Sequence, residues 1–217
     1  MKPMSRLRGW LRGKQPTLPS TDAYDLWAAS YPPHAHNPLM ELEQRAMLAL
    51  LPPLEGALVL DLAGGTGRYG LLAQKRGARQ VISMDNSAAM LERNPLAQRV
   101  LATGEALPLP PQSVDVLLCG LALGHLPDLT LSIHEIGRVL RVHGVALISD
   151  VHPFVALNGA ERTFTGVDGR QYAVEHYIHL YEDYGRAASA AGLRIDAVAE
   201  PRLGRTPVVI VYRMVKI

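Results

Sequence analysis

Two aspartates on either side of a glycine-rich loop are the residues whose types and spacing point most directly to chemistry. Asp61 ends an apolar run and is followed by the loop 63–67, and Asp85 ends the next apolar run. Gly65 and Gly67 allow the backbone to approach a ligand closely. A carboxylate after the second strand is suited to binding the hydroxyl groups of a ribose. Together these residues predict a nucleotide-like ligand.

Asp61 distinguishes between two classes of such ligands. The run Gly65-Thr66-Gly67-Arg68-Tyr69-Gly70 also fits dinucleotide-binding proteins, but a carboxylate directly before the loop would repel a pyrophosphate. It favours a ligand with an ammonium or sulfonium group, and S-adenosylmethionine carries both, with an adenosine for Asp85. Structural alternatives remain open, because Asp61 could cap a turn and Asp85 or Ser87 could cap the next helix.

Four consecutive segments resemble the motifs of class I S-adenosylmethionine-dependent methyltransferases. Residues 59–68 resemble motif I, which often reads D-L-A-C-G-T-G in the small-molecule branch; Gly64 stands in place of the cysteine, a change that the turn should tolerate. Residues 81–91 resemble motif II, 102–108 the next block with Thr103 in place of an aspartate, and 114–128 the fourth-strand block. This resemblance covers about residues 22–152, and it identifies the chain as a member of that family.

The resemblance implies an enzyme that uses S-adenosylmethionine to methylate a small molecule. With the expected strand ends and the two tyrosines that precede the sheet, it gives the predicted cofactor-binding residues: Tyr24, Tyr31, Asp61, Ala63, Gly65, Gly67, Asp85, Asn86, Met90, Thr103, Gly104, Glu105 and Gly120.

Three histidines are candidates for the catalytic group: His125, His152 and His176. Methyl transfer is an in-line displacement, so the enzyme mainly aligns the reactants, and a general base is needed only if the acceptor must lose a proton. For His125, a contact with the cofactor or support of a neighbour is an equal alternative. His176 and His179 would share a helical face, but no Cys or Asp spacing supports them, and no metal is expected.

Apolar runs that alternate with helical patterns predict the elements that must position these residues. They indicate a doubly wound, mostly parallel Rossmann-like α/β sheet of about seven strands, because such alternation is typical of parallel sheets covered on both faces. The expected strands are 58–62, 80–84, 99–102, 114–119, 145–151, 193–199 and 208–214. The expected helices are 22–31, 39–51, 68–76, 87–93, 129–140 and about 180–191.

The domain organisation is predicted from changes in composition. Residues 1–20 form a basic flexible arm with no acidic residue, and residues 21–217 form a single methyltransferase domain. Within it we expect N-terminal helices (21–56), the cofactor-binding half (57–152), a substrate-side insertion over the sheet's edge (153–181), and a C-terminal helix and strands (182–217). Pro16 and Pro19 would stop any helix of the arm.

Bulk properties limit the partners and the compartment. The chain has 48% hydrophobic and 19% charged residues, values that exclude a disordered protein. The single Cys119 and the absence of a membrane-spanning run predict a cytoplasmic monomer or homodimer. A small-molecule acceptor is the expected partner. An RNA or other nucleic-acid methyltransferase is one alternative, which the basic arm favours, but residues 119–124 lack the Asn/Asp-Pro-Pro-aromatic signature of base methylation, so no nucleic-acid partner is expected. A non-catalytic S-adenosylmethionine-binding partner protein is the remaining alternative.

Overall fold

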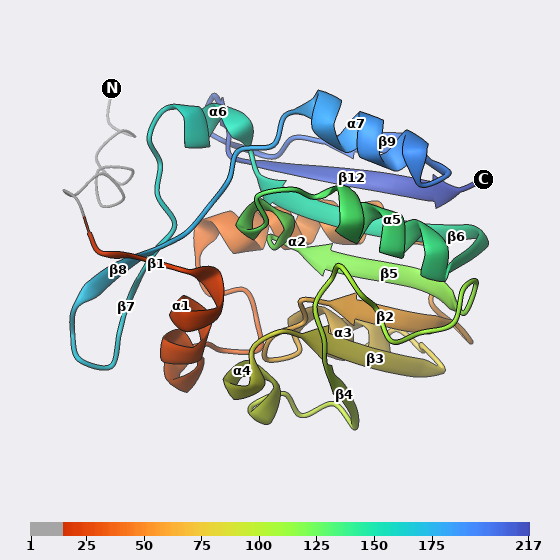
Figure 1. Ribbon diagram of the computed structural model, residues 1–217, viewed down its shortest axis with the longest axis horizontal. Coiled ribbons are helices and arrows are strands. Elements are labelled where there is room, and N and C mark those ends of the chain that lie inside the picture. The colour runs from red at the N-terminus through yellow and green to blue at the C-terminus, as the bar shows by residue number, and fades with distance from the viewer. Residues whose placement is uncertain (1–14) are drawn as a thin grey trace.

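A seven-stranded sheet in the order β4-β3-β2-β5-β6-β12-β9 forms the centre of the computed structural model, which describes residues 15–217 (Figure 1). The strands β2 to β6 pair in parallel, whereas β12 runs antiparallel to both of its neighbours. Their bounds are β2 Leu58–Leu62, β3 Gln80–Asp85, β4 Gln98–Leu101, β5 Val114–Gly120, β6 Leu140–Val151, β9 Leu193–Ala199 and β12 Val209–Lys216. The predicted fold class is confirmed.

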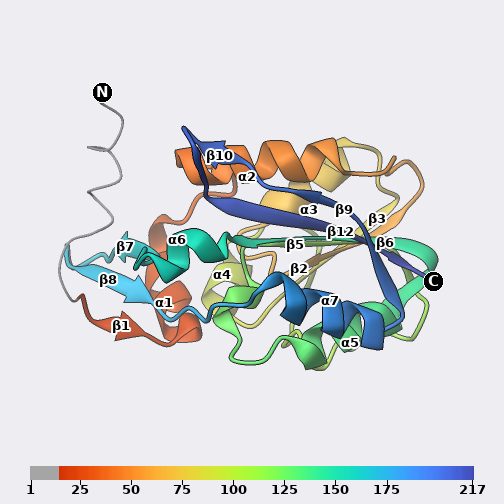
Figure 2. The same ribbon diagram turned by 90° about the horizontal axis from the view of Figure 1, so that it is seen from above.

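Helices cover the sheet on both faces, as Figure 2 shows. The helices α2 (Pro38–Ala49) and α3 (Arg68–Lys75) pack on one face, and α5 (Thr130–Val139) and α7 (Tyr181–Ala190) on the other. Successive strand residues point to opposite faces, so Val59 joins the α2–α3 core and Leu60 joins the α5–α7 core. Burial on both faces explains why these strands read as continuous apolar runs.

The N-terminal helices agree closely with the predicted boundaries, whereas several short elements were not predicted. Asn37 caps α2 through a hydrogen bond to the Met40 amide, and Ser87 caps α4 in the same way. The remaining elements are α1 Ser20–Trp27, the 3-10 turns η2 Ala28–Ser30 and η3 Leu123–His125, α4 Ala88–Glu92, α6 Pro153–Leu157, β10 Arg202–Leu203 and β11 Thr206–Pro207.

A second, three-stranded sheet forms most of what we call the cap (residues 15–31 and 160–177). It consists of β1 (Thr17–Leu18), β8 (Gln171–Val174) and β7 (Thr163–Thr165), in the order β1-β8-β7. The ring of Phe164 stacks on Trp27 of α1 at 4.8 Å between centroids. The cap therefore has a small hydrophobic core of its own.

The predicted place of the insertion is wrong. It was expected over the sheet's edge, but the Tyr177 amide donates to the Gly124 carbonyl oxygen at 2.6 Å, just beyond the carboxyl end of β5. Because β5 is the central strand of the sheet, the cap lies above the strand ends, where parallel sheets bind ligands.

The predicted boundary of the basic arm at residue 20 is also wrong. The carbonyl oxygens of Pro16 and Leu18 accept hydrogen bonds from the Ala173 and Glu175 amides at 3.0 and 2.9 Å. Proline fixes an extended backbone, which prevents a helix but is compatible with an edge strand. The rest of the predicted arm lies outside the described residues.

Strand β6 begins at Leu140 rather than at 145. The exposed residues 141–143 interrupt its apolar pattern, and His143 has a positive φ of 65°. Among residues 15–217, no helix is long and apolar enough to cross a membrane.

Candidate active site

A cleft of about 970 Å³, part of it open to solvent, lies between the carboxyl ends of the central strands and the cap. Residues 63–66 of the loop, Asp61, Asp85 and Gly104 form the side that we call the floor. The opposite side includes Tyr24, Tyr31, His125 and Arg162. Asn86, Met90, Ala63, Gly65 and Gly120 also line the cleft, so ten of the predicted cofactor-binding residues are brought together there.

The glycine loop turns sharply from β2 into α3. Gly65 has a φ of +51°, and Gly67, at the amino end of α3, has a φ of +96°. The residue at 64 has no room for a side chain, because a Cβ there would lie 2.2 Å from Ser83 Oγ. The prediction that the turn tolerates Gly64 in place of cysteine therefore understates the constraint. Next to Ser83, position 64 has space only for glycine.

Asp85 links the loop to the next strand. Its Oδ2 accepts a hydrogen bond from the Gly65 amide at 2.7 Å, and its Oδ1 accepts one from the Ser87 amide at 2.9 Å. Burial raises the pKa of Asp85, although both amide hydrogen bonds oppose this shift. Ser87, not Asp85, is the cap of α4, and Asp85 can still bind a ligand because each carboxylate oxygen can accept a second hydrogen bond.

Asp61 lies beneath the loop and is 1% exposed. Its Oδ2 accepts a hydrogen bond from the Gly70 amide at 2.8 Å. Burial raises the pKa of this carboxyl to about 7, even though the Gly70 amide and Arg68 favour the charged form. A cation bound next to Asp61 would therefore favour its ionisation.

Two hydroxyl oxygens that line the cleft are buried without a hydrogen-bond partner among the described residues. They are Thr66 Oγ1, in the loop, and Ser132 Oγ, on α5. Buried polar atoms are satisfied in most structures, so a ligand is the expected partner here. Ala63 and Leu121, at the ends of β2 and β5, also line the cleft with positive φ values of 52° and 58°. Such strain in residues other than glycine is common at ligand sites.

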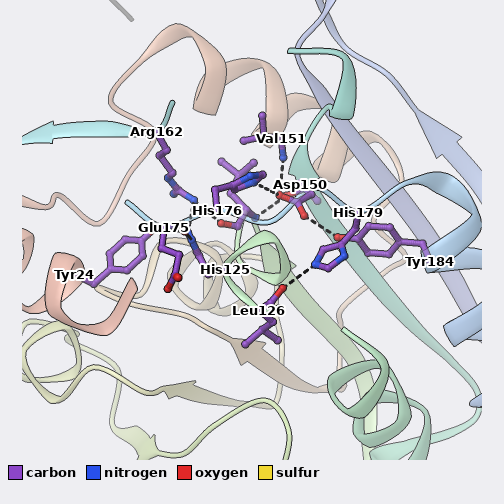
Figure 3. Close-up of polar contacts among 12 residues, drawn as sticks. Tyr24, His125, Leu126, Asp150, Val151, Arg162, Glu175, His176, His179 and Tyr184 are labelled. Carbon is purple, nitrogen blue, oxygen red and sulfur yellow. Dashed lines mark hydrogen bonds and ion pairs between the residues drawn. The ribbon is translucent and has the colours of Figure 1, made fainter. Parts of the chain in front are cut away.

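His125 connects the sheet to the cap (Figure 3). Its Nε2 accepts hydrogen bonds from Arg162 Nη1 at 2.9 Å and from the Tyr24 hydroxyl at 3.1 Å. Because Arg162 can only donate, Nδ1 carries the proton and donates to the Glu175 carbonyl oxygen at 2.7 Å. Burial, followed by the charge of Arg162, lowers the pKa of His125 to about 3. His125 is thus neutral, with both ring nitrogens occupied.

Asp150, near the end of β6, forms a second polar cluster with His176 and Tyr184. His176 Nε2 lies 3.4 Å from Asp150 Oδ1, and the Tyr184 hydroxyl donates to Asp150 Oδ2 at 2.8 Å (Figure 3). Burial alone would raise the pKa of Asp150, but its hydrogen bonds and the nearby His176 outweigh it and lower that pKa. Asp150 therefore holds His176 and Tyr184 in place.

A buried ion pair supports the cleft from α2. Arg68 Nη1 lies 2.6 Å from Glu43 Oε2, and Glu43 Oε1 accepts hydrogen bonds from Tyr69 and Ser149 at 2.6 Å each. A Cβ at Gly120 would lie 2.4 Å from the Tyr69 ring. Three elements, α2, α3 and β6, therefore meet at Glu43, and β5 approaches Tyr69 closely only because residue 120 is glycine.

Residues 60–148 match the family model described as a methyltransferase domain. A malonyl-[acyl-carrier protein] O-methyltransferase from Gallionella capsiferriformans is 35% identical over 133 residues, which are 55% of this chain and 46% of that protein. A ubiquinone/menaquinone biosynthesis C-methyltransferase from Xanthomonas axonopodis pv. citri is 36% identical over 117 residues, or 48% and 46% of the two chains. Residues 60–148 are thus a methyltransferase domain, and these relatives support the resemblance to class I S-adenosylmethionine-dependent methyltransferases.

The fold of this methyltransferase is also that of a solved family member. An S-adenosylmethionine-dependent methyltransferase from Mesorhizobium loti superposes with a TM-score of 0.68 at 21% identity, covering 81% of this chain and 98% of that chain. The alignments with the two sequence relatives span less than half of each relative's length. The predicted family and its cofactor, S-adenosylmethionine, are confirmed.

The residues on the floor of the cleft suit this cofactor. Asp61 suits the cationic groups, Asp85 the ribose hydroxyls, and the unpartnered hydroxyls of Thr66 and Ser132 offer further hydrogen bonds. The individual cofactor contacts remain predictions.

Three predicted cofactor residues do not line the cleft. Thr103 and Glu105 are exposed beside Gly104, which does line it. Gly67 faces the other way, since a Cβ there would lie 2.6 Å from Asn94 Oδ1. Neighbouring residues in an extended segment point in different directions, and sequence spacing alone did not determine which one points inward.

His152 and His176 do not line the cleft either. His152 is fully buried, with Nδ1 accepting from the Phe154 amide and Nε2 near Tyr181 and Glu200. The expectation that it points into the acceptor pocket is wrong, because Pro153 starts α6 and His152 caps it.

The expected shared helical face of His176 and His179 is also wrong, because both precede α7 in irregular backbone. His179 Nε2 bonds the Leu126 carbonyl oxygen instead. Within residues 15–217, no group of His, Cys, Asp or Glu side chains is arranged to hold a metal ion.

Sequence reasoning missed four residues of the site: Glu43, Arg68, Ser132 and Arg162. Arg68 directly follows the glycine loop, and its position there was a usable signal. Ser132 is a small polar residue between Leu131 and Ile133 on α5, which its helical pattern could have marked as inward-facing. Glu43 and Arg162 belong to no motif and are far from the loop in sequence.

Proposed function

We propose that this methyltransferase transfers a methyl group from S-adenosylmethionine to a small-molecule acceptor. The observation that carries the proposal is a single cleft with the acid-lined floor on one side and Tyr24, His125 and Arg162 on the other. The cofactor supplies an activated methyl group. The two relatives are named a malonyl-[acyl-carrier protein] O-methyltransferase and a ubiquinone/menaquinone biosynthesis C-methyltransferase, so their names leave the acceptor of this chain open.

The side chains of the cleft act by positioning. Both nitrogens of His125 are occupied and its pKa is lowered to about 3, so it does not accept a proton at neutral pH. It instead fixes Tyr24 and Arg162 relative to the floor. Alignment of the two reactants can lower the barrier by about 7–11 kcal/mol, which is sufficient for an acceptor whose nucleophile needs no base.

Cofactor binding and methyl transfer are tested separately. Calorimetry should show S-adenosylhomocysteine binding more tightly than NADH; the reverse order would contradict the cofactor class. Radiolabelled S-adenosylmethionine should then label compounds in a panel of small acids, phenols and amines, and should leave tRNA unlabelled.

Labelling of tRNA alone would favour the nucleic-acid alternative, for which the basic residues before residue 15 are the specific observation. Cofactor binding without transfer to either panel would favour a non-catalytic partner protein. A cytoplasmic monomer or homodimer remains part of the proposal.

A further inference from the structure

The two arginines that line the cleft differ in their charge partners. Arg68 is paired with Glu43. No carboxylate of residues 15–217 lies within 4.0 Å of the Arg162 guanidinium, and residues 1–14 contain no aspartate or glutamate. An arginine stays protonated in proteins. Arg162 therefore brings to the cleft a positive charge that no carboxylate contacts directly, while the buried Asp150 lies close enough to favour that charge.

The guanidinium of Arg162 also has unused donors. Nη1 donates to the Leu121 carbonyl oxygen at 2.6 Å and to His125 Nε2 at 2.9 Å. Nε and Nη2 donate to no group in the described part of the chain, and neither is among its buried atoms without a partner. These two nitrogens form one edge of the planar guanidinium, which matches the two oxygens of a carboxylate or phosphate.

The position of Arg162 separates it from the acids of the floor. Asp61 lies one residue before the end of β2 and Asp85 ends β3, whereas Arg162 belongs to the cap and donates to the Leu121 carbonyl oxygen just after β5. Its Cζ lies 5.6 Å from the centroid of the Tyr24 ring, so an apolar aromatic surface adjoins the charge. The cleft is thus acidic on the cofactor side and basic on the opposite side.

We propose that Arg162 binds an oxyanion, a carboxylate or a phosphate, on the methyl acceptor, with Nε and Nη2 holding two of its oxygens. This inference rests on the proposed function. His125 and the Leu121 carbonyl oxygen hold the guanidinium by Nη1, so its free edge is fixed before the acceptor enters. Fixing a donor in advance reduces the entropy that binding costs.

The experiment uses the full chain saturated with S-adenosylhomocysteine and three matched probes. Benzoate and phenyl phosphate carry the two possible oxyanions, and benzamide is the neutral counterpart. The variants are Arg162→Gln, Arg162→Lys, and Arg170→Gln as a control on the same hairpin with an 80% exposed side chain. Melting temperatures establish that each variant folds, and calorimetry gives each dissociation constant.

The wild type should prefer an anionic probe over benzamide by about tenfold or more, since hydrogen bonds between ionised groups are about twice as strong as neutral ones. Arg162→Gln should abolish that preference, Arg162→Lys should retain part of it, and Arg170→Gln should leave it unchanged. The better of the two anions identifies the acceptor class.

Three results separate the possible failures. No anion preference in the wild type, or an equal preference in Arg162→Gln, would overturn the proposal. Weaker binding of S-adenosylhomocysteine by Arg162→Gln without any change in probe binding would assign Arg162 to the cofactor's carboxylate and also overturn it. Failure of the wild type to bind S-adenosylhomocysteine would instead contradict the proposed function.

Discussion

The floor and the cap of the cleft are built in different ways. The floor consists of chain neighbours: Asp61 precedes the loop directly, and the loop is bonded to Asp85 at the end of the adjacent strand. The cap side brings Tyr24, His125, Arg162 and Glu175 together from three segments that are far apart in the sequence. The predicted cofactor side is thus built from local sequence, whereas the side proposed to face the acceptor depends on long-range packing.

The two sides also differ in electrostatics. On the floor, burial raises the pKa values of two acids, while on the cap side burial and a neighbouring cation lower the pKa of a base. The floor is therefore poised to gain negative charge when a cation binds. The cap already carries a fixed positive charge.

The largest expected effect is on the ion pair that supports the floor. Glu43→Ala leaves Arg68 buried without its partner and should lower the free energy of unfolding by about 3–5 kcal/mol. Glu41→Ala, at an exposed position of the same helix, is the matched control. Urea denaturation measures both variants. If Glu43→Ala were as stable as Glu41→Ala, Arg68 would have another partner. The contrast between a paired Arg68 and an Arg162 without an ion pair would then disappear.

The next effect concerns cofactor affinity. Asp85→Ala should weaken S-adenosylmethionine binding tenfold to a hundredfold, about 1.4–2.8 kcal/mol, because the ribose loses its carboxylate partner. Glu105→Ala should have no effect, since Glu105 is exposed and outside the cleft. Calorimetry of both variants tests whether the floor ends at Gly104. An unchanged affinity for Asp85→Ala would remove that residue from the cofactor site.

Asp61 and His125 should change the stability in opposite directions as pH falls. The folded pKa of Asp61, about 7, exceeds its ordinary 3.8, so its stabilising effect is present in acid and is lost as pH rises towards 7. The folded pKa of His125, about 3, lies below its ordinary 6.5, so its stabilising effect is present above pH 6.5 and is lost as pH falls.

Between pH 8 and pH 5 each effect amounts to about 2 kcal/mol, and the two nearly cancel. Relative to the wild type, Asp61→Asn should lose stability over this range and His125→Gln should gain it. Urea titrations at pH 5, 6.5 and 8 provide the measurement. Variants that follow the wild-type pH profile would show that neither group is perturbed as described.

The smallest effect is a proton released on cofactor binding. At pH 7 a carboxyl with a pKa of about 7 is half protonated, so the sulfonium and ammonium of S-adenosylmethionine should displace up to about half a proton from Asp61. Calorimetry in two buffers of different ionisation enthalpy measures the release. Asp61→Asn should abolish it, whereas the exposed Asp128→Asn should not. Persistence of the release in Asp61→Asn would assign the proton to another group.

The sequence predicted the floor of the cleft better than the cap side. Strand β2 coincides with the predicted 58–62, and most floor residues were identified, because strand periodicity and the glycine loop are local signals. Strand β1 has two residues, too few for any period, and Arg162 belongs to no motif. His152 was expected in the cleft because it follows a strand, but the helix that begins at Pro153 gives it a capping role instead. Interactions between distant segments decided each of these cases.

The parallel pairing of β1 with β8 has a consequence for the order in which this protein matures. Thr17 lies opposite Ala173, so the cap cannot close on a ribosome until the chain has emerged to about residue 177. The pairs β2–β3 and β3–β4 join strands that follow one another along the chain. We expect a nascent chain to acquire cofactor-binding loops before it can select an acceptor, and pulse-labelled hydrogen exchange during refolding should protect Gly65 earlier than Ala173.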